Sequence, residues 1–170
     1  MLTPNNNIGE VTLIGTGGGY GESIVIHLGN QEWAVIDSCV NPNTKESLPL
    51  EYLKSINVDI ANEVKLILIS HWHDDHIKGI SQLYNKAKNA ELFISHVQDR
   101  SKFMAFVGFD YKKIDDDITA VSTYEFVKCI QILKERKPKI INKANADKRL
   151  WLTKITFSRL LIFTEIRKKN

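Results

Sequence analysis

The sequence is poor in cysteine and has no long apolar run. Its two cysteines, Cys39 and Cys129, are too few for a disulfide framework. No stretch reaches the roughly 18 apolar residues that a membrane-spanning helix needs. The first residues also lack the charged-then-apolar pattern of a signal peptide. We therefore expect a cytoplasmic protein that keeps its thiols reduced and does not enter a membrane.

Length and composition predict one folded domain with a basic end. The chain has 170 residues, and its apolar fraction of 43% is enough for a packed core. Residues 1–130 hold 11 Lys and Arg against 17 Asp and Glu, whereas residues 131–170 hold 12 against 3. A basic end can contact nucleic acid or an acidic surface, or it can simply be solvated. Both alternatives stay open at this point.

The most informative stretch is His-Trp-His-Asp-Asp-His, at residues 71–76. Four of these side chains are good metal ligands: His71, His73, Asp75 and His76. Imidazole and carboxylate groups suit borderline divalent metals such as zinc. The alternative interpretation is a polar loop that contains histidines by chance, and the density of ligand types argues against it.

The surroundings of this motif predict a strand before it and a helix after it. Residues 64–70 form an apolar run that is typical of a buried strand. Apolar side chains at helical spacing follow the motif, at Ile80, Leu83, Tyr84 and Ala87. We expect a helix over residues 77–88, and we expect His71 and His73 to share one face. The motif then lies at the carboxyl edge of a sheet, where α/β proteins tend to bind ligands.

The residues after this strand resemble the signature of the metallo-β-lactamase superfamily, as His71-x-His73-x-Asp75-His76. The resemblance implies that His71 and His73 bind one metal and that Asp75 and His76 bind a second, so up to two zinc ions. It also implies an αββα sandwich and a hydrolase, with a metal-bound hydroxide attacking an ester or phosphodiester. Such a metal lowers the pKa of bound water from about 16 to about 7. Asp75 is thereby a catalytic as well as a ligating candidate.

A glycine-rich run at residues 15–21 lies between two predicted strands, residues 10–15 and 23–28. The run resembles a phosphate-binding loop, but it lacks the Gly-Lys-Ser/Thr ending of one. A strand rather than a helix follows it, so no helix N-terminus points at a phosphate. We expect a tight turn between antiparallel strands. Together with the compact early strands, it makes the chain most similar to the competence-protein (ComEC-type) branch, whose members are linked with nucleic acid.

Asp37 ends the next predicted strand, residues 32–37, and is followed by Ser38 and Cys39. The family usually has Asp-x-Gly here, so Cys39 replaces the expected glycine. The resemblance implies that Asp37 is a catalytic residue that hydrogen-bonds the histidine loop and orients the ligands. The alternative is an ordinary turn residue at the end of a strand.

The resemblance covers roughly residues 9–142 and weakens after residue 96. The family supplies two more histidines and a bridging aspartate downstream. No histidine follows His96 in this sequence, and His96 does not match either family position. Asp147 is the one acidic residue between residue 135 and the tail that follows Leu150. We therefore expect an incomplete, truncated form of the domain, whose isolated chain hydrolyses model substrates no better than free zinc.

These observations predict an α/β fold with three regions. They are a flexible N-terminus at residues 1–8, a metallo-β-lactamase-like domain at residues 9–142, and a basic, apolar-rich tail at residues 143–170. Because half of a sandwich leaves one sheet face open, we expect a partner or a second copy to cover that face.

Two functional hypotheses follow from the sequence. The first is a zinc-dependent hydrolase that acts on a small-molecule or phosphodiester substrate, with nucleic acid among the candidates. The second is a degenerate, non-catalytic remnant that binds metal weakly or acts through a partner. The intact motif favours the first hypothesis, and the missing downstream histidines favour the second.

Overall fold

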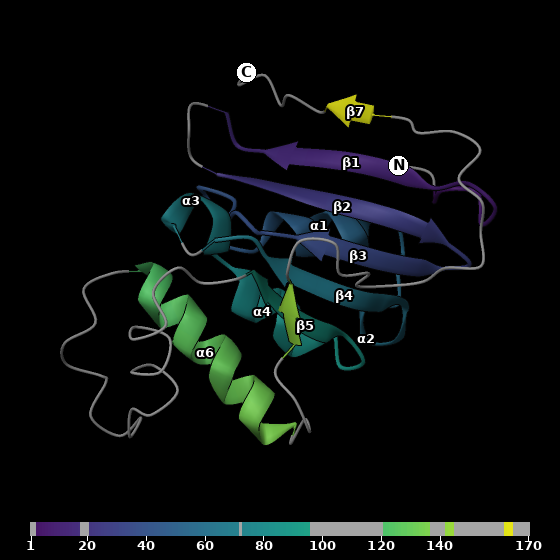
Figure 1. The fold of residues 1–170 in the computed structure, drawn as a ribbon. Coiled ribbons are helices and arrows are strands. Elements are labelled where there is room, and N and C mark those ends of the chain that lie inside the picture. The colour runs from purple at the N-terminus through teal and green to yellow at the C-terminus, as the bar shows by residue number, and fades with distance from the viewer. Residues whose placement is uncertain are drawn as a thin grey trace.

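A computed structural model of the chain describes residues 3–17, 21–71, 73–95, 121–136, 142–144 and 162–164. Its strands are β1 (Glu10–Gly15), β2 (Glu22–Gly29), β3 (Glu32–Ile36), β4 (Val64–Ile69), β5 (Glu91–Ser95), β6 (Asn142–Ala144) and β7 (Ile162–Thr164). Its helices are α1 (Leu48–Ser55), α2 (Ile60–Glu63), α3 (Asp74–Ile77), α4 (Ile80–Lys86) and α6 (Val121–Glu135). All the strands join one sheet in the order β6-β5-β4-β3-β2-β1-β7 (Figure 1). The predicted α/β class is confirmed.

The strand directions bring several strand ends to one edge of the sheet. β1 pairs with β2, and β2 with β3, in antiparallel fashion, so β1 and β3 run the same way. β3, β4 and β5 are parallel neighbours. The carboxyl ends of β1, β3, β4 and β5 therefore lie at the same edge, which is where the histidine motif follows β4.

The main core lies between the sheet and the helices α1, α4 and α6. Alternation along β2 turns Val25 and His27 to the side where the core packs, because successive side chains of a strand point to opposite faces. The helices contribute apolar stripes at helical spacing, including Leu50 and Leu53 of α1, Ile80 and Leu83 of α4, and Phe126 and Ile130 of α6. Full burial of each such side chain stabilises the fold by about 1.5–3 kcal/mol.

The opposite face of the sheet carries a smaller apolar cluster. Ala34, Leu66 and Phe93 are buried there, and the side chains packed on them are only partly buried: Ile26, Leu28 and Leu68. Within the part of the chain that the structure describes, no second sheet covers this face. The described residues thus form one sheet with helices on one side, which corresponds to one half of the sandwich that the resemblance implies.

The predicted helix over residues 77–88 is interrupted in the structure. α3 ends at Ile77, and α4 begins at Ile80 after a left-handed Gly79 with φ of +78°. A Cβ on Gly79 would lie 2.8 Å from Cγ1 of Val40 and 3.1 Å from the Ser47 backbone. The break therefore lets the backbone pass close to the loop after β3, which a periodicity argument alone does not detect.

The two ends of the chain also contact the sheet where they are described. Near the N-terminus, the Ile8 carbonyl accepts a hydrogen bond from Nδ1 of His27 at 2.9 Å. β6 pairs with β5, and β7 pairs with β1, both in parallel. Short stretches of the predicted tail thus belong to the sheet, whereas His96 and Asp147 lie outside the described residues. Among those described, no helix is both long enough and apolar enough to cross a membrane.

Candidate metal centre

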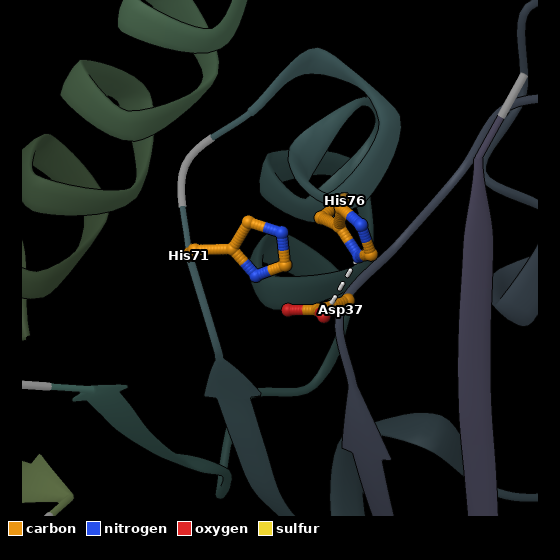
Figure 2. Close-up of side chains that lie close together, drawn as sticks. All are labelled: Asp37, His71 and His76. Atoms are coloured by element: carbon orange, nitrogen blue, oxygen red, sulfur yellow. Dashed lines mark hydrogen bonds and ion pairs between the residues drawn. The ribbon is translucent and has the colours of Figure 1, made fainter. Parts of the chain in front are cut away.

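The candidate site is built at the shared carboxyl edge of three parallel strands. Asp37 follows β3, Ser70 and His71 follow β4, and Ser95 ends β5. The backbone N–H of Asp37 donates to the Leu68 carbonyl at 2.9 Å, which ties the end of β3 to the end of β4. The parallel pairing of β3 with β4 therefore fixes the backbone positions from which the polar side chains at this edge extend (Figure 2).

Asp37 is the buried centre of the site. Its Oδ1 accepts from the Ser70 N–H at 2.7 Å, and its Oδ2 accepts from the Ser70 hydroxyl at 2.5 Å. Oδ2 also accepts from Nδ1 of His76 at 3.1 Å. Asp37 has a φ of +58°, a left-handed conformation that aspartate tolerates better than most residues. Cys39 does not have a positive φ, so the backbone at position 39 does not require the glycine that the family usually has there.

His71 and His76 lie next to each other above Asp37. Their ring centroids are 3.9 Å apart, with an angle of 44° between the ring planes. Asp37, His71 and His76 each offer one ligand atom, and these atoms all lie within 4.8 Å of one another (Figure 2). His71 is exposed and His76 is partly buried, so a small ion can reach the pair from solvent.

His73 and Asp75 lie at the margin of this three-residue group. The His73 ring centroid is 5.2 Å from that of His71, and the two rings meet edge to face. Oδ2 of Asp75 is 3.4 Å from Nε2 of His76, and half of the Asp75 side chain is exposed. The structure thus brings together His71, His76 and Asp37, and it leaves His73 and Asp75 as exposed neighbours that do not complete a tighter cluster.

The glycine-rich turn packs against the motif. β1 and β2 pair from Glu10–His27 to Gly15–Glu22, so the turn joins antiparallel strands as expected. Gly21 has a φ of +114°, and a Cβ there would collide with the Asp75 carbonyl oxygen and approach Cβ of Cys39 to 2.9 Å. The missing side chain at Gly21 is what lets the turn lie against the backbone of the motif.

Cys39 is not a thiolate at neutral pH despite its position beside this turn. Burial, reinforced by the charge of Glu22, raises the pKa of the Cys39 thiol to about 12. Its Sγ approaches the Ile14 carbonyl at 4.0 Å. Cys39 is almost fully buried and does not belong to the group of possible ligands formed by Asp37, His71 and His76, so it packs as an apolar side chain.

Three serines at the site were not singled out by the sequence. Ser70 contacts both Asp37 and His71, Ser95 donates its hydroxyl to the Ser70 carbonyl, and Ser23 donates to the Asp37 carbonyl at 2.9 Å. The position of Ser70 directly before the first histidine was a local signal. Ser23 and Ser95 carried no such signal, because only strand pairing brings them to the site.

Comparisons with known proteins give one family match and a partly similar curated protein. Residues 16–152 match the sequence model of a family described as the metallo-beta-lactamase superfamily. The chain is 30% identical over 95 residues to cleavage and polyadenylation specificity factor subunit 3 of Dictyostelium discoideum, an alignment that covers 55% of this chain and 12% of that protein.

Two solved structures are also similar to parts of the chain. Rm3 metallo-beta-lactamase is 29% identical with a TM-score of 0.35, and the match covers 46% of this chain and 27% of that one. The hydrolase AbOPH of the beta lactamase superfamily is 19% identical with a TM-score of 0.48, covering 76% and 44%. The chain spans 12% of the length of the curated relative and less than half of each of these two structures.

Proposed function

This chain belongs to the metallo-beta-lactamase superfamily, and from that membership we propose that it is a metal-dependent hydrolase whose metal binds at the loop after β4. The observation that carries the proposal is the convergence of the His71 and His76 imidazoles at one strand edge beside the buried carboxylate of Asp37, which accepts a hydrogen bond from His76. A buried polar residue with a left-handed backbone conformation, as at Asp37, is typical of functional sites.

The donor set fits a divalent metal, and zinc is our proposed ion. Imidazole nitrogens and carboxylate oxygens suit zinc, whereas a magnesium or calcium site would be built from oxygen atoms. His71, His73, Asp75 and His76 would supply the ligands, for up to two ions. A bound metal supplies Lewis acidity and a water that is acidified toward neutral pH.

Asp37 would act on the ligands rather than as one of them. Both of its oxygens already accept hydrogen bonds, and one of these bonds comes from Nδ1 of His76. A carboxylate that accepts from the outer nitrogen of an imidazole fixes the ring and raises its basicity toward a metal on the other nitrogen. Asp75 is the exposed carboxylate next to Nε2 of His76, so it would face both the metal and the substrate.

An ester or a phosphodiester is the proposed substrate class, with the phosphodiester preferred. The name of the curated relative refers to cleavage and polyadenylation, which is chemistry of nucleic acid. Residues 131–170 carry 12 Lys and Arg against 3 Asp and Glu, which would favour a polyanion. Assignment to the ComEC-type branch stays a prediction, because none of the similar proteins described above carries that name.

A partner or a second copy over the open sheet face also stays part of the proposal. What supports it is the partial burial of Ile26, Leu28 and Leu68 on the face opposite the helices. Apolar side chains that gather on one face commonly mark an interface.

The second candidate function is a metal-binding remnant without turnover. The observation that favours it is the absence of any histidine after His96 in the sequence. A catalytic zinc usually has three protein ligands and a water, so a site limited to the motif is short of donors.

Hydrolysis of a model phosphodiester separates the two candidates. Purified chain with added zinc is compared with zinc alone and with His76→Ala. Turnover above the zinc control that His76→Ala abolishes supports the hydrolase. Turnover at the level of the zinc control, with zinc retained by the protein, supports the remnant. If the protein does not retain zinc, both candidate functions are contradicted.

A further inference from the structure

We propose that Ser70 is a positioning residue that fixes the tautomer of His71 and presents Nε2 of that ring as the ligand atom. The inference rests on the metal-binding function proposed above, and it assigns a role to a residue outside the ligand motif. It starts from a chain of short hydrogen bonds that runs from Asp37 through the Ser70 hydroxyl to His71.

The direction of these hydrogen bonds follows from counting protons. The Ser70 hydroxyl has one proton, and it lies 2.5 Å from Oδ2 of Asp37 and 2.7 Å from Nδ1 of His71. A carboxylate can only accept, so the hydroxyl proton goes to Asp37. Toward His71, the oxygen of Ser70 is then left to accept. Nδ1 of His71 must therefore carry the ring proton, and Nε2 keeps its lone pair.

The same carboxylate sets the second ring directly. Oδ2 of Asp37 accepts from Nδ1 of His76 at 3.1 Å, which leaves Nε2 of His76 with its lone pair on the side of Asp75. One buried carboxylate thus determines which nitrogen is protonated in two neighbouring imidazoles: directly in His76, and through the Ser70 hydroxyl in His71. Without the hydroxyl, His71 would lose its link to Asp37 while His76 would keep its own.

Ser70 is held firmly enough to act in this way. Its N–H donates to Oδ1 of Asp37 at 2.7 Å, and its carbonyl accepts from the Ser95 hydroxyl at the end of β5. His71 is exposed, and among the described aromatic side chains its ring contacts those of His73 and His76. The hydrogen bond to Ser70 is the one side-chain hydrogen bond that His71 makes to the residues that the structure describes.

The first test reads the tautomer in the metal-free protein. Nitrogen-15 spectra of histidine side chains are recorded at about pH 8, where an ordinary imidazole is neutral. The expected result is the Nδ1–H form for His71 in the wild type and in Ser70→Thr, and loss of that preference in Ser70→Ala. An Nε2–H form in the wild type, or identical spectra for Ser70→Ala and wild type, would overturn the inference.

The second test reads metal affinity with a matched control. Cobalt(II), which has a visible spectrum in such sites, is titrated against a chelator. We expect affinity to fall about 10–100-fold in Ser70→Ala and to recover in Ser70→Thr. The control Ser38→Ala removes a buried hydroxyl next to Asp37 in sequence whose hydrogen-bond partner is the Ser47 hydroxyl, and it should leave affinity unchanged.

The outcomes keep the two proposals apart. Equal affinity of Ser70→Ala and wild type would overturn the role of Ser70 while leaving the metal function intact. A wild type that binds no cobalt or zinc would overturn the proposed function, and the nitrogen-15 spectra would still decide whether Ser70 sets the ring. Equal losses in Ser38→Ala and Ser70→Ala would reduce Ser70 to a general structural role, which also overturns the inference.

Discussion

At the scale of single residues, the site depends on the hydrogen bonds that the Asp37 carboxylate accepts. Asp37 is buried, adopts a left-handed backbone conformation, and accepts hydrogen bonds from Ser70 and His76. The aspartate could be recognised from the sequence through its place at the end of a strand. The resemblance implied that Asp37 hydrogen-bonds the histidine loop, and the structure has that bond from His76. The bonds from Ser70 could not be predicted, because they join residues 33 apart in the chain.

Asp37→Asn should lower metal affinity about 10–100-fold, because an amide is a weaker acceptor than a carboxylate for Nδ1 of His76. Chelator competition measures the change. Asp74→Asn removes an equal charge from the same loop, where Asp74 forms an ion pair with Lys78 at 3.4 Å, and it serves as the control. Equal losses in the two variants would mean that Asp37 acts only through its charge.

Cys39 should resist alkylation in the folded protein. Burial raises the pKa of its thiol to about 12, so the reactive thiolate is scarce at neutral pH, and its side chain is almost fully inaccessible. Mass spectrometry after iodoacetamide treatment should show labelling at Cys39 only when urea is present. Rapid labelling in buffer would contradict the packing of the turn against the loop after β3.

At the scale of elements, the strands were predictable and the close approaches between them were not. The predicted positions of β1, β2, β3 and β4 are confirmed to within about a residue, because alternation and apolar runs are local signals. The break at Gly79 and the fit of Gly21 depend on segments distant in sequence. The pairing of β7 with β1 likewise has no local signal.

Gly21→Ala should destabilise the fold more than Gly17→Ala does. Both glycines have positive φ, which costs roughly 1–2 kcal/mol for another residue. Only at Gly21 would the new Cβ also meet the Asp75 carbonyl and Cβ of Cys39, whereas nothing lies within 4 Å at Gly17. Urea unfolding measures both losses. Equal losses would show that the turn does not pack on the motif.

His27 of β2 should make stability depend on pH. Burial lowers its pKa from the ordinary value of 6.5, against the opposing effects of the Ile8 carbonyl and Glu10. His27 then binds a proton at higher pH in the unfolded chain than in the folded protein. The free energy of unfolding therefore decreases as pH falls below about 6.5. Urea unfolding between about pH 7.5 and 5.5 should show this loss, and His27→Gln should reduce it. The same reduction in His73→Gln, whose side chain is exposed, would refute the assignment to His27.

At the scale of the whole molecule, the described residues form one sheet with helices on one face and the histidine motif at its carboxyl edge. The sequence predicted that architecture and the place of the loop, because the motif follows its strand directly. It also predicted a shortage of downstream ligands. That shortage stays a prediction, because Asp147 and the residues directly after Ser95 lie outside the described residues.

The metal-binding remnant predicts that the isolated chain hydrolyses phosphodiesters and β-lactams no better than free zinc, whereas the hydrolase predicts turnover above that level. His71 and His73 would give one metal two ligands, and Asp75 and His76 would give the other two, which is short of the three that catalytic zinc usually has. Steady-state assays beside a zinc control measure the rate. Robust turnover abolished by His76→Ala would mean that further groups of this chain or of a second copy complete the site.

Zinc retention by the purified chain tests the central claim most directly. Protein loaded with zinc is passed through gel filtration, and metal content is measured by atomic emission for the wild type, for His71→Ala/His76→Ala and for Asp74→Asn. We expect at least about one zinc per chain in the wild type and in Asp74→Asn, and loss of zinc in the double variant with an unchanged far-UV circular dichroism spectrum. Equal zinc content in the double variant and the wild type, or no retained zinc in the wild type, would contradict that claim.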